Sequence, residues 1–141
     1  MALSTYAPSE INVSLGGVPI SGFEVGTFVN IEKVEDTWSN KSGIGGEGIR
    51  ILKKDNFYTV TFTLIYSSAS NDYLNGLVQA DELLPGSGLV PILIEDGLGR
   101  TSFSSSEAWV VKKATTAFSD AADPREWMVH VYSPQYFAAG I

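Results

Sequence analysis

A strict two-residue alternation over residues 58–66 constrains the fold of this chain more than any other feature. The apolar members share one side and the threonines the other: Tyr58, Val60, Phe62, Leu64 and Tyr66 against Thr59, Thr61 and Thr63. Successive side chains of a β-strand point to opposite faces, so the pattern predicts a long strand with one face in a core. The threonine face is polar but uncharged, and it suits either water or another protein surface.

Turn and cap signals divide the rest of the chain into further strands and one helix. Gly16-Gly17 predicts a tight turn between strands at 11–15 and 18–21, because both glycines can adopt positive φ. A helix is predicted from Ser70 or Asn71, either of which can cap it, to the stop at Pro85. Further strands are predicted at 27–34, 89–95, 100–103, 107–113 and 125–132.

About eight strands and one helix predict a β-rich α+β fold. We expect a single domain over residues 1–141, in which two packed antiparallel sheets form a sandwich or a partly open barrel with one helix on a sheet face. Glycine-rich turns interrupt the alternation between two strands, which predicts a projecting loop or hairpin at 37–56. Residues 133–141 are predicted to form a C-terminal tail.

No catalytic or metal-binding pattern is recognisable, and we expect a protein that is not an enzyme and uses no cofactor or metal. The chain contains no cysteine and one histidine, His130, which alternates with apolar neighbours and is interpreted as a pleat position on a sheet. The adjacent carboxylates at 35–36, 81–82 and 95–96 suit helix ends and turns better than they suit a glycosidase cleft.

Charge and hydropathy narrow the partners that we expect. Nine Lys and Arg against sixteen Asp and Glu give a net charge of −7, whereas nucleic-acid affinity depends on cations, so tight DNA or RNA binding is not expected. No stretch approaches the roughly 18 to 20 apolar residues of a membrane helix, and residues 1–10 lack the basic and apolar parts of a signal peptide. We therefore expect a chain that works in solution and contacts no membrane.

Large aromatic residues are divided between a predicted core and a predicted partner surface. Four of them alternate with polar neighbours and are predicted to be core: Phe62, Phe103, Trp109 and Trp127. Trp38, Tyr136 and Phe137 lie in segments without an evident core of their own, so we expect a partner surface to bury them. An exposed aromatic cleft on a monomer would instead indicate a β-sandwich module that binds carbohydrate or another ligand.

An ordered series of short segments extends over nearly the whole chain. Its members are 1–8, 16–23, 26–32, 35–36, 46–48, 59–64, 70–74, 91–96, 107–110 and 125–127. In this order they resemble the tail tube proteins of contractile-tailed bacteriophages. Related rings occur in phage-tail-like bacteriocins and in type VI secretion tubes, and the sequence leaves these alternatives open.

The resemblance implies a subunit that functions by forming a channel together with other copies of itself. Six copies would form a ring with a continuous β-barrel around a lumen, and stacked rings would form the inner tail tube that conducts DNA from capsid to host. DNA would pass without specific binding, and the other implied partners are the sheath, tail terminator, baseplate and tape measure proteins. Such a protein is assembled in the cytoplasm of the bacterial host and resides in the virion tail.

Two sets of surface residues are expected for such a subunit. Those expected to face the lumen, where carboxylates and neutral polar groups would not hold passing phosphates, are Glu32, Glu47, Thr59, Thr61 and Thr63. Those expected at contacts between subunits or rings are Trp38, Lys41, Arg50, Lys53, Lys54, Tyr136 and Phe137. The cations of the 37–56 segment would meet acidic rims of a neighbouring copy.

Overall fold

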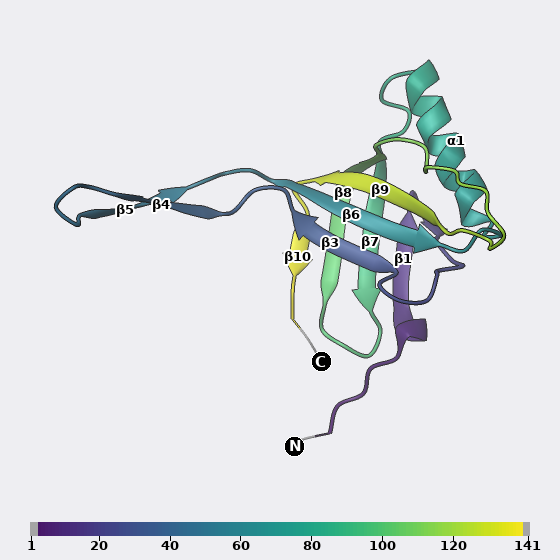
Figure 1. Cartoon of the computed structure of the whole chain (residues 1–141), viewed down its shortest axis with the longest axis horizontal. Coiled ribbons are helices and arrows are strands. Elements are labelled where there is room, and N and C mark those ends of the chain that lie inside the picture. The colour runs from purple at the N-terminus through teal and green to yellow at the C-terminus, as the bar shows by residue number, and fades with distance from the viewer. Residues whose placement is uncertain (1–2, 140–141) are drawn as a thin grey trace.

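Ten β-strands, one α-helix and one short 3-10 helix are found in residues 3–139, which the computed structural model describes (Figure 1). The 3-10 turn Pro8–Glu10 precedes β1 (Ile11–Leu15), β2 (Val18–Pro19), β3 (Val29–Lys33), β4 (Trp38–Ser42), β5 (Gly48–Leu52) and β6 (Phe57–Leu64). Helix α1 (Ser70–Leu83) follows, and then β7 (Val90–Asp96), β8 (Ser102–Val110), β9 (Arg125–Tyr132) and β10 (Gln135–Phe137). No helix in this part of the chain is long and apolar enough to cross a membrane.

Eight of the strands form one antiparallel sheet in the order β2-β1-β7-β8-β9-β6-β3, with β10 added beside β8. The sheet forks along β8, because residues 102–104 pair with β10 whereas residues 107–110 pair with β9. Beyond the fork, β9, β6 and β3 run obliquely across β1, β7 and β8 (Figure 1). The β-rich class with one helix is confirmed, but the two packed layers that we expected are halves of one bent sheet. The second sheet, β4-β5, has only two strands.

The core lies between the two halves of the bent sheet and is closed on one side by α1. Its buried apolar side chains are Val13, Leu15, Ile20, Val60, Phe62, Leu64, Leu74, Val78, Ile92, Ile94, Phe103, Ala108, Val110, Trp127, Val129 and Val131. The predicted alternation of β6 is confirmed up to Leu64, where the strand ends, and Tyr66 lies beyond it and is exposed. Burial of Phe62, Phe103 and Trp127 is likewise confirmed.

Two side-chain hydrogen bonds fix the helix to the sheet. The Trp127 indole Nε1 donates to Asn71 Oδ1 at 2.9 Å, and the Tyr73 hydroxyl donates to the carbonyl of Leu15 at 2.8 Å. Burial raises the pKa of the Tyr73 phenol. Gly16 lies beside this hydroxyl with φ of +64°, so the close approach and the backbone angle both require glycine in the β1-β2 turn.

A β-bulge in β8 explains two differences from the predicted strands. Two residue steps along β7, from Val90 to Ile92, face three steps along β8, from Ala108 to Ser105. The extra residue exchanges the inward and outward positions of β8. Phe103 is buried before the bulge, but Ala108 and Val110 are buried after it. Trp109 is therefore turned out of the core in which we predicted it, and the predicted strands at 100–103 and 107–113 are one strand.

Candidate assembly surfaces

The outer surface of β3, β6 and β9 is a continuous polar face, which we call the threonine face. Glu32 is opposite Thr59, which is opposite His130, and the next row joins Asn30, Thr61 and Met128. Thr63 is opposite Glu126 at the end away from the arm. The face therefore comprises Asn30, Glu32, Thr59, Thr61, Thr63, Glu126, Met128 and His130. Two carboxylates lie on it and none of its eight members is Lys or Arg.

Four of the five residues predicted to face a lumen are brought together on the threonine face: Glu32, Thr59, Thr61 and Thr63. The fifth, Glu47, lies far along the chain's projecting hairpin, in the turn between β4 and β5. Its carboxylate accepts a hydrogen bond from the backbone N–H of Gly45 at 3.1 Å and so closes the turn. The structure thus separates Glu47 from the other four, because its loop is not part of the large sheet.

The hairpin of β4 and β5 projects from the body, and we call residues 38–54 the arm (Figure 1). Ser39 is its most protected residue, and every other residue of the arm is exposed. Its apolar side chains are exposed as well: Trp38, Ile44, Ile49, Ile51 and Leu52. Large apolar side chains gathered on an exposed hairpin indicate a surface that a partner covers.

The two faces of the arm differ in the contacts that their side chains make within the molecule. On one face the Arg50 guanidinium lies 3.8 Å from the centre of the Trp38 ring, and Leu52 is opposite Trp38. The other, which we call the isoleucine face, pairs Ser39 with Ile51 and Lys41 with Ile49. Ile49 and Ile51 are 57% and 43% exposed, compared with 46% for Trp38 and 47% for Leu52 on the first face.

The remaining predicted contact residues lie at the base of the arm and in β10. Lys53 forms an exposed ion pair with Glu35, with 3.8 Å between Nζ and Oε2, and Lys54 is exposed beside it. The Tyr136 ring packs edge-on against Phe103 and Tyr58 of its own molecule, at 5.3 and 5.7 Å between ring centres. Phe137, on the opposite side of β10, is 55% exposed.

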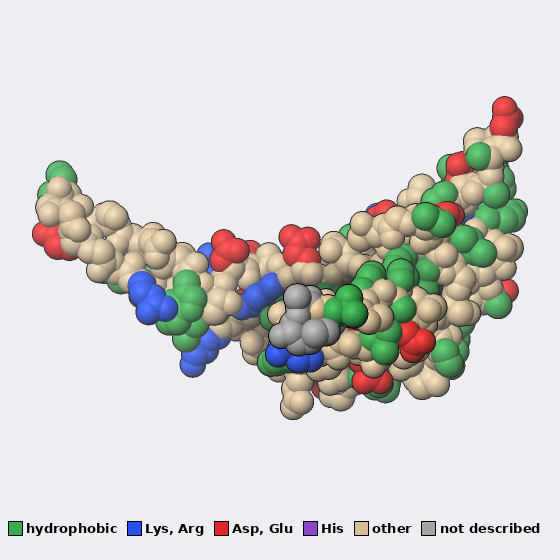
Figure 2. Space-filling view, turned by 90° about the horizontal axis from the view of Figure 1, so that it is seen from below, with side chains coloured by type: hydrophobic (Ala, Val, Ile, Leu, Met, Phe, Trp, Pro, Cys, Tyr) green, Lys and Arg blue, Asp and Glu red, His purple; other side chains and the backbone are tan. Residues whose placement is uncertain are grey.

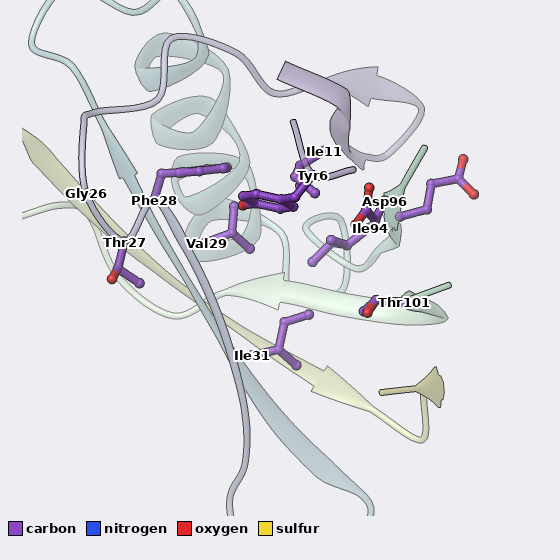
Figure 3. Close-up of a pocket in the computed structure, with 11 residues that line it drawn as sticks. Tyr6, Ile11, Gly26, Thr27, Phe28, Val29, Ile31, Ile94, Asp96 and Thr101 are labelled. Carbon is purple, nitrogen blue, oxygen red and sulfur yellow. The ribbon is translucent and has the colours of Figure 1, made fainter. Parts of the chain in front are cut away.

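A cleft of about 410 Å³ opens between β3 and β7, and we call it the β3 cleft (Figure 3). Its walls are mainly apolar: Ile11, Phe28, Val29, Ile31 and Ile94, with the Tyr6 ring lying between Val29 and Ile11. Glu95 and Asp96 stand at its rim. A neighbouring hollow shares Gly26 and Phe28 with the cleft and adds Glu24. No lining residue of either hollow is Lys, Arg or His.

Sequence reasoning missed the β3 cleft, because its walls come from segments that are far apart in the chain. Ile31 and Ile94 were each placed in a strand, but nothing local indicates that these strands face one another across a gap. Within residues 3–139, no group of three or more His, Cys, Asp and Glu side chains lies close enough together to hold a metal ion.

Comparison with solved structures shows the class of fold. The chain is similar to a chain in the cryo-EM structure of the anti-feeding prophage cap, a tube-terminating cap, with a TM-score of 0.64, 12% identity and coverage of 99% of this chain and 95% of that one. It is also similar to a chain in the sheath/tube terminator of an extracellular contractile injection system, PVC, in the extended state, with a TM-score of 0.63, 13% identity and coverage of 98% and 100%. A chain of the extended PVC sheath–tube complex matches with a TM-score of 0.57, 12% identity and coverage of 94% and 90%.

Comparison with characterised sequences shows that the chain is similar to a phage protein. The chain is 28% identical over 144 residues to structural protein ORF10 of Pseudomonas phage KPP10, and the match covers 97% of this chain and 83% of the phage protein. No family model matches the sequence. The chain is thus similar in sequence to a structural protein of a phage and similar in fold to chains from contractile injection systems.

Proposed function

We propose that the chain is a structural subunit of a contractile phage tail, and that its rings stack into the inner tube through which DNA leaves the capsid. The observation that carries the proposal is likeness over the whole chain, both in sequence to a phage structural protein and in fold to chains from tube-containing assemblies. Its site of action would be the virion, after assembly in the cytoplasm of the bacterial host.

The geometry of the sheet supports a ring of copies around a channel. Strand β3 is the last strand of the sheet and leaves one row of backbone N–H and C=O groups unpaired. Such an edge invites a strand from another molecule. Pairing between copies would join their sheets into a barrel, and we place the threonine face on its inner wall. The carboxylates of Glu32 and Glu126 would disfavour phosphate binding to that wall, where Lys112 is the cation that lines a hollow beside Glu126.

A terminator that caps the tube is the second candidate. It is favoured by the two higher TM-scores, which belong to a tube-terminating cap and a sheath/tube terminator. A terminator needs one surface that binds the tube end, whereas a tube subunit must bind its own kind on both sides of the ring. In either role the adjoining partners would be tube, sheath and baseplate proteins. A subunit of a bacteriocin tube or of a secretion tube would need the same surfaces, so these remain alternatives to a phage tail.

Electron microscopy of the concentrated protein tests both candidates. Hollow filaments of uniform width are the result expected for a tube subunit, and single rings that never stack are the result expected for a terminator. In isolated particles, an antibody against the chain should decorate the tube along its length in the first case and only at one end in the second. Dispersed monomers at every concentration, salt and pH would contradict both and favour a monomeric ligand-binding module.

A further inference from the structure

The arm has an apolar surface that its own body does not cover. It points away from the large sheet (Figure 1), and no residue of β4 or β5 is buried. A lone two-stranded hairpin is marginally stable in water unless something packs on it. Trp38 stacks with Arg50 on one face of the arm, and on the isoleucine face Ile49 and Ile51 remain 57% and 43% exposed.

Charge divides the molecule between the arm and the body. The arm carries Lys41, Arg50, Lys53, Lys54 and Glu47, a net charge of +3. Because the net charge of the whole chain is −7, the remaining residues together carry −10. In Figure 2 the Lys and Arg side chains gather mainly on the arm and beside its base. An arm of this charge is attracted to an acidic surface of a second copy and gains little by meeting another arm.

The β3 cleft has the complementary character. Its apolar walls lie beside the carboxylate of Asp96, and Glu24 extends the negative rim over the adjoining hollow. Glu95 contributes to the rim from an outward position of β7, so its side chain points to the other face of the sheet from Ile94. Among the other hollows, one beside β9 contains Lys112 and one beside β1 has no charged lining residue. A third, in the 117–123 loop, also combines apolar side chains with the carboxylates Asp120 and Asp123, but no residue of β3 lines it. The cleft also lies along β3, the strand whose outer edge is unpaired.

We infer that the isoleucine face of the arm seats in the β3 cleft of a second copy. Ile49 and Ile51 enter between Ile31 and Ile94, and the Lys41 ammonium reaches the carboxylates at the rim. Tyr6 packs on the outer side of the inserted isoleucines. The inference rests on the proposed self-assembly and names the surface that receives the arm.

Disulfide capture tests the seat in a chain that has no cysteine of its own. Ser39→Cys places a thiol on the isoleucine face without altering the isoleucines, and Thr27→Cys places one on the cleft wall. We expect mild oxidation of this double variant to give a ladder of covalent dimers and larger species, because a disulfide forms only when the two Cα atoms come within about 7 Å. Ser39→Cys with Gln79→Cys, on the exposed side of α1, is the matched control and should stay monomeric on the same gel.

Charge reversal gives a second readout. Glu24→Lys should raise the concentration needed for assembly about fivefold, and adding Lys41→Glu should bring that concentration most of the way back to the wild-type value. Glu82→Lys, an equal charge change at the exposed end of α1, should leave that concentration unchanged.

The outcomes separate this inference from the proposed function. If rings or tubes form but the control cross-links as well as the cleft variant, or neither cross-links, the arm seats elsewhere and the tube role stands. If the unaltered protein never assembles, the proposed function fails and the inference fails with it.

Discussion

Ser105 holds the bulge at which β8 passes from one layer to the other. Its hydroxyl donates to the carbonyl of Tyr132 at 2.6 Å and accepts from the backbone N–H of Glu107 at 3.2 Å. The side chain thus satisfies backbone groups that a bulge removes from the regular ladder. Beyond the bulge, Ala108 faces the core and Trp109 faces His130 on the outer surface.

Ser105→Ala should lower the stability of the folded chain by about 1 kcal/mol, because two hydrogen bonds of the bulge lose their partner. We expect a fall in Tm of roughly 3 °C in thermal unfolding followed by circular dichroism. Ser106→Ala, at the exposed neighbouring position, is the control and should change Tm little. An unchanged Tm for Ser105→Ala would mean that the sheet, rather than the hydroxyl, holds the bulge.

Tyr73 gives the stability of the fold a dependence on alkaline pH. Burial raises the pKa of its phenol above the ordinary value of 10.0, so the folded state retains the proton after the unfolded chain has released it. The contribution of Tyr73 is therefore complete below pH 10 and is lost as the pH rises through the folded pKa.

Tyr73→Phe removes both the bond to Leu15 and the titration. The variant should be less stable than the wild type by about 1 kcal/mol near neutral pH, and this difference should shrink above pH 10. Urea unfolding of the two proteins over a pH series measures it. A difference that stays constant to strongly alkaline pH would show that the Tyr73 proton is not linked to folding.

At the scale of elements, local patterns predicted those parts of the fold that local physics determines. The Gly16-Gly17 turn has both glycines at positive φ, and the helix predicted near Ser70 is found as α1. The predicted cap is wrong, because the residue before the helix is Ala69, which makes no side-chain cap hydrogen bond, and Ser70 and Asn71 lie within the helix. The fork in β8 and the β3 cleft have no such signal, since they depend on which distant strands lie side by side. The threonines were identified as one face from their spacing alone, whereas Glu47 was grouped with them by charge, and charge does not place a residue in space.

The arm is the element whose removal should separate folding from assembly. Deleting residues 39–55 takes away no buried side chain, so we expect a folded monomer with Tm within a few degrees of the wild type. Analytical ultracentrifugation and electron microscopy should show no stacked rings. A variant with a Gly-Ser linker of equal length in place of the deleted residues controls for strain at the shortened connection. Normal tubes from the deletion variant would rule out a role for the arm in stacking.

At the scale of the whole molecule, the two faces of the bent sheet differ in composition in the way that the proposed channel wall requires. The inner faces are filled with apolar side chains, whereas the outer threonine face is polar and carries Glu32 and Glu126, with Lys112 lining a hollow beside Glu126 and Met128. A wall between a packed core and a watery channel requires this division. The aromatic group of Phe57, Trp109 and Tyr132 lies beside the arm end of the threonine face.

Thr61→Cys tests whether the threonine face lines a channel. The monomer should react with both a small maleimide and one linked to a bulky polymer, whereas the assembled tube should react only with the small one. Gln79→Cys on the exposed side of α1 is the control for a surface away from the proposed lumen. Equal labelling of Thr61→Cys by the bulky reagent in monomer and tube would place this face outside the channel.

The spacing of the strand pairings also bears on the order in which the molecule takes shape. The arm pairs residues 38–42 with 48–52, whereas β1 pairs Ile11 with Asp96 and β6 pairs Phe57 with Tyr132. A hairpin closes in about 1–10 μs, but sheets built from distant pairings take about milliseconds to seconds. The pairing of the arm thus needs only residues that are close in the chain, whereas the cleft forms only after β1, β3 and β7 have met in the sheet. If the arm of one copy binds in the cleft of another, a chain can receive the next copy only after its own cleft has formed. An incomplete chain that has joined an assembly through its arm would then end the growth of that assembly.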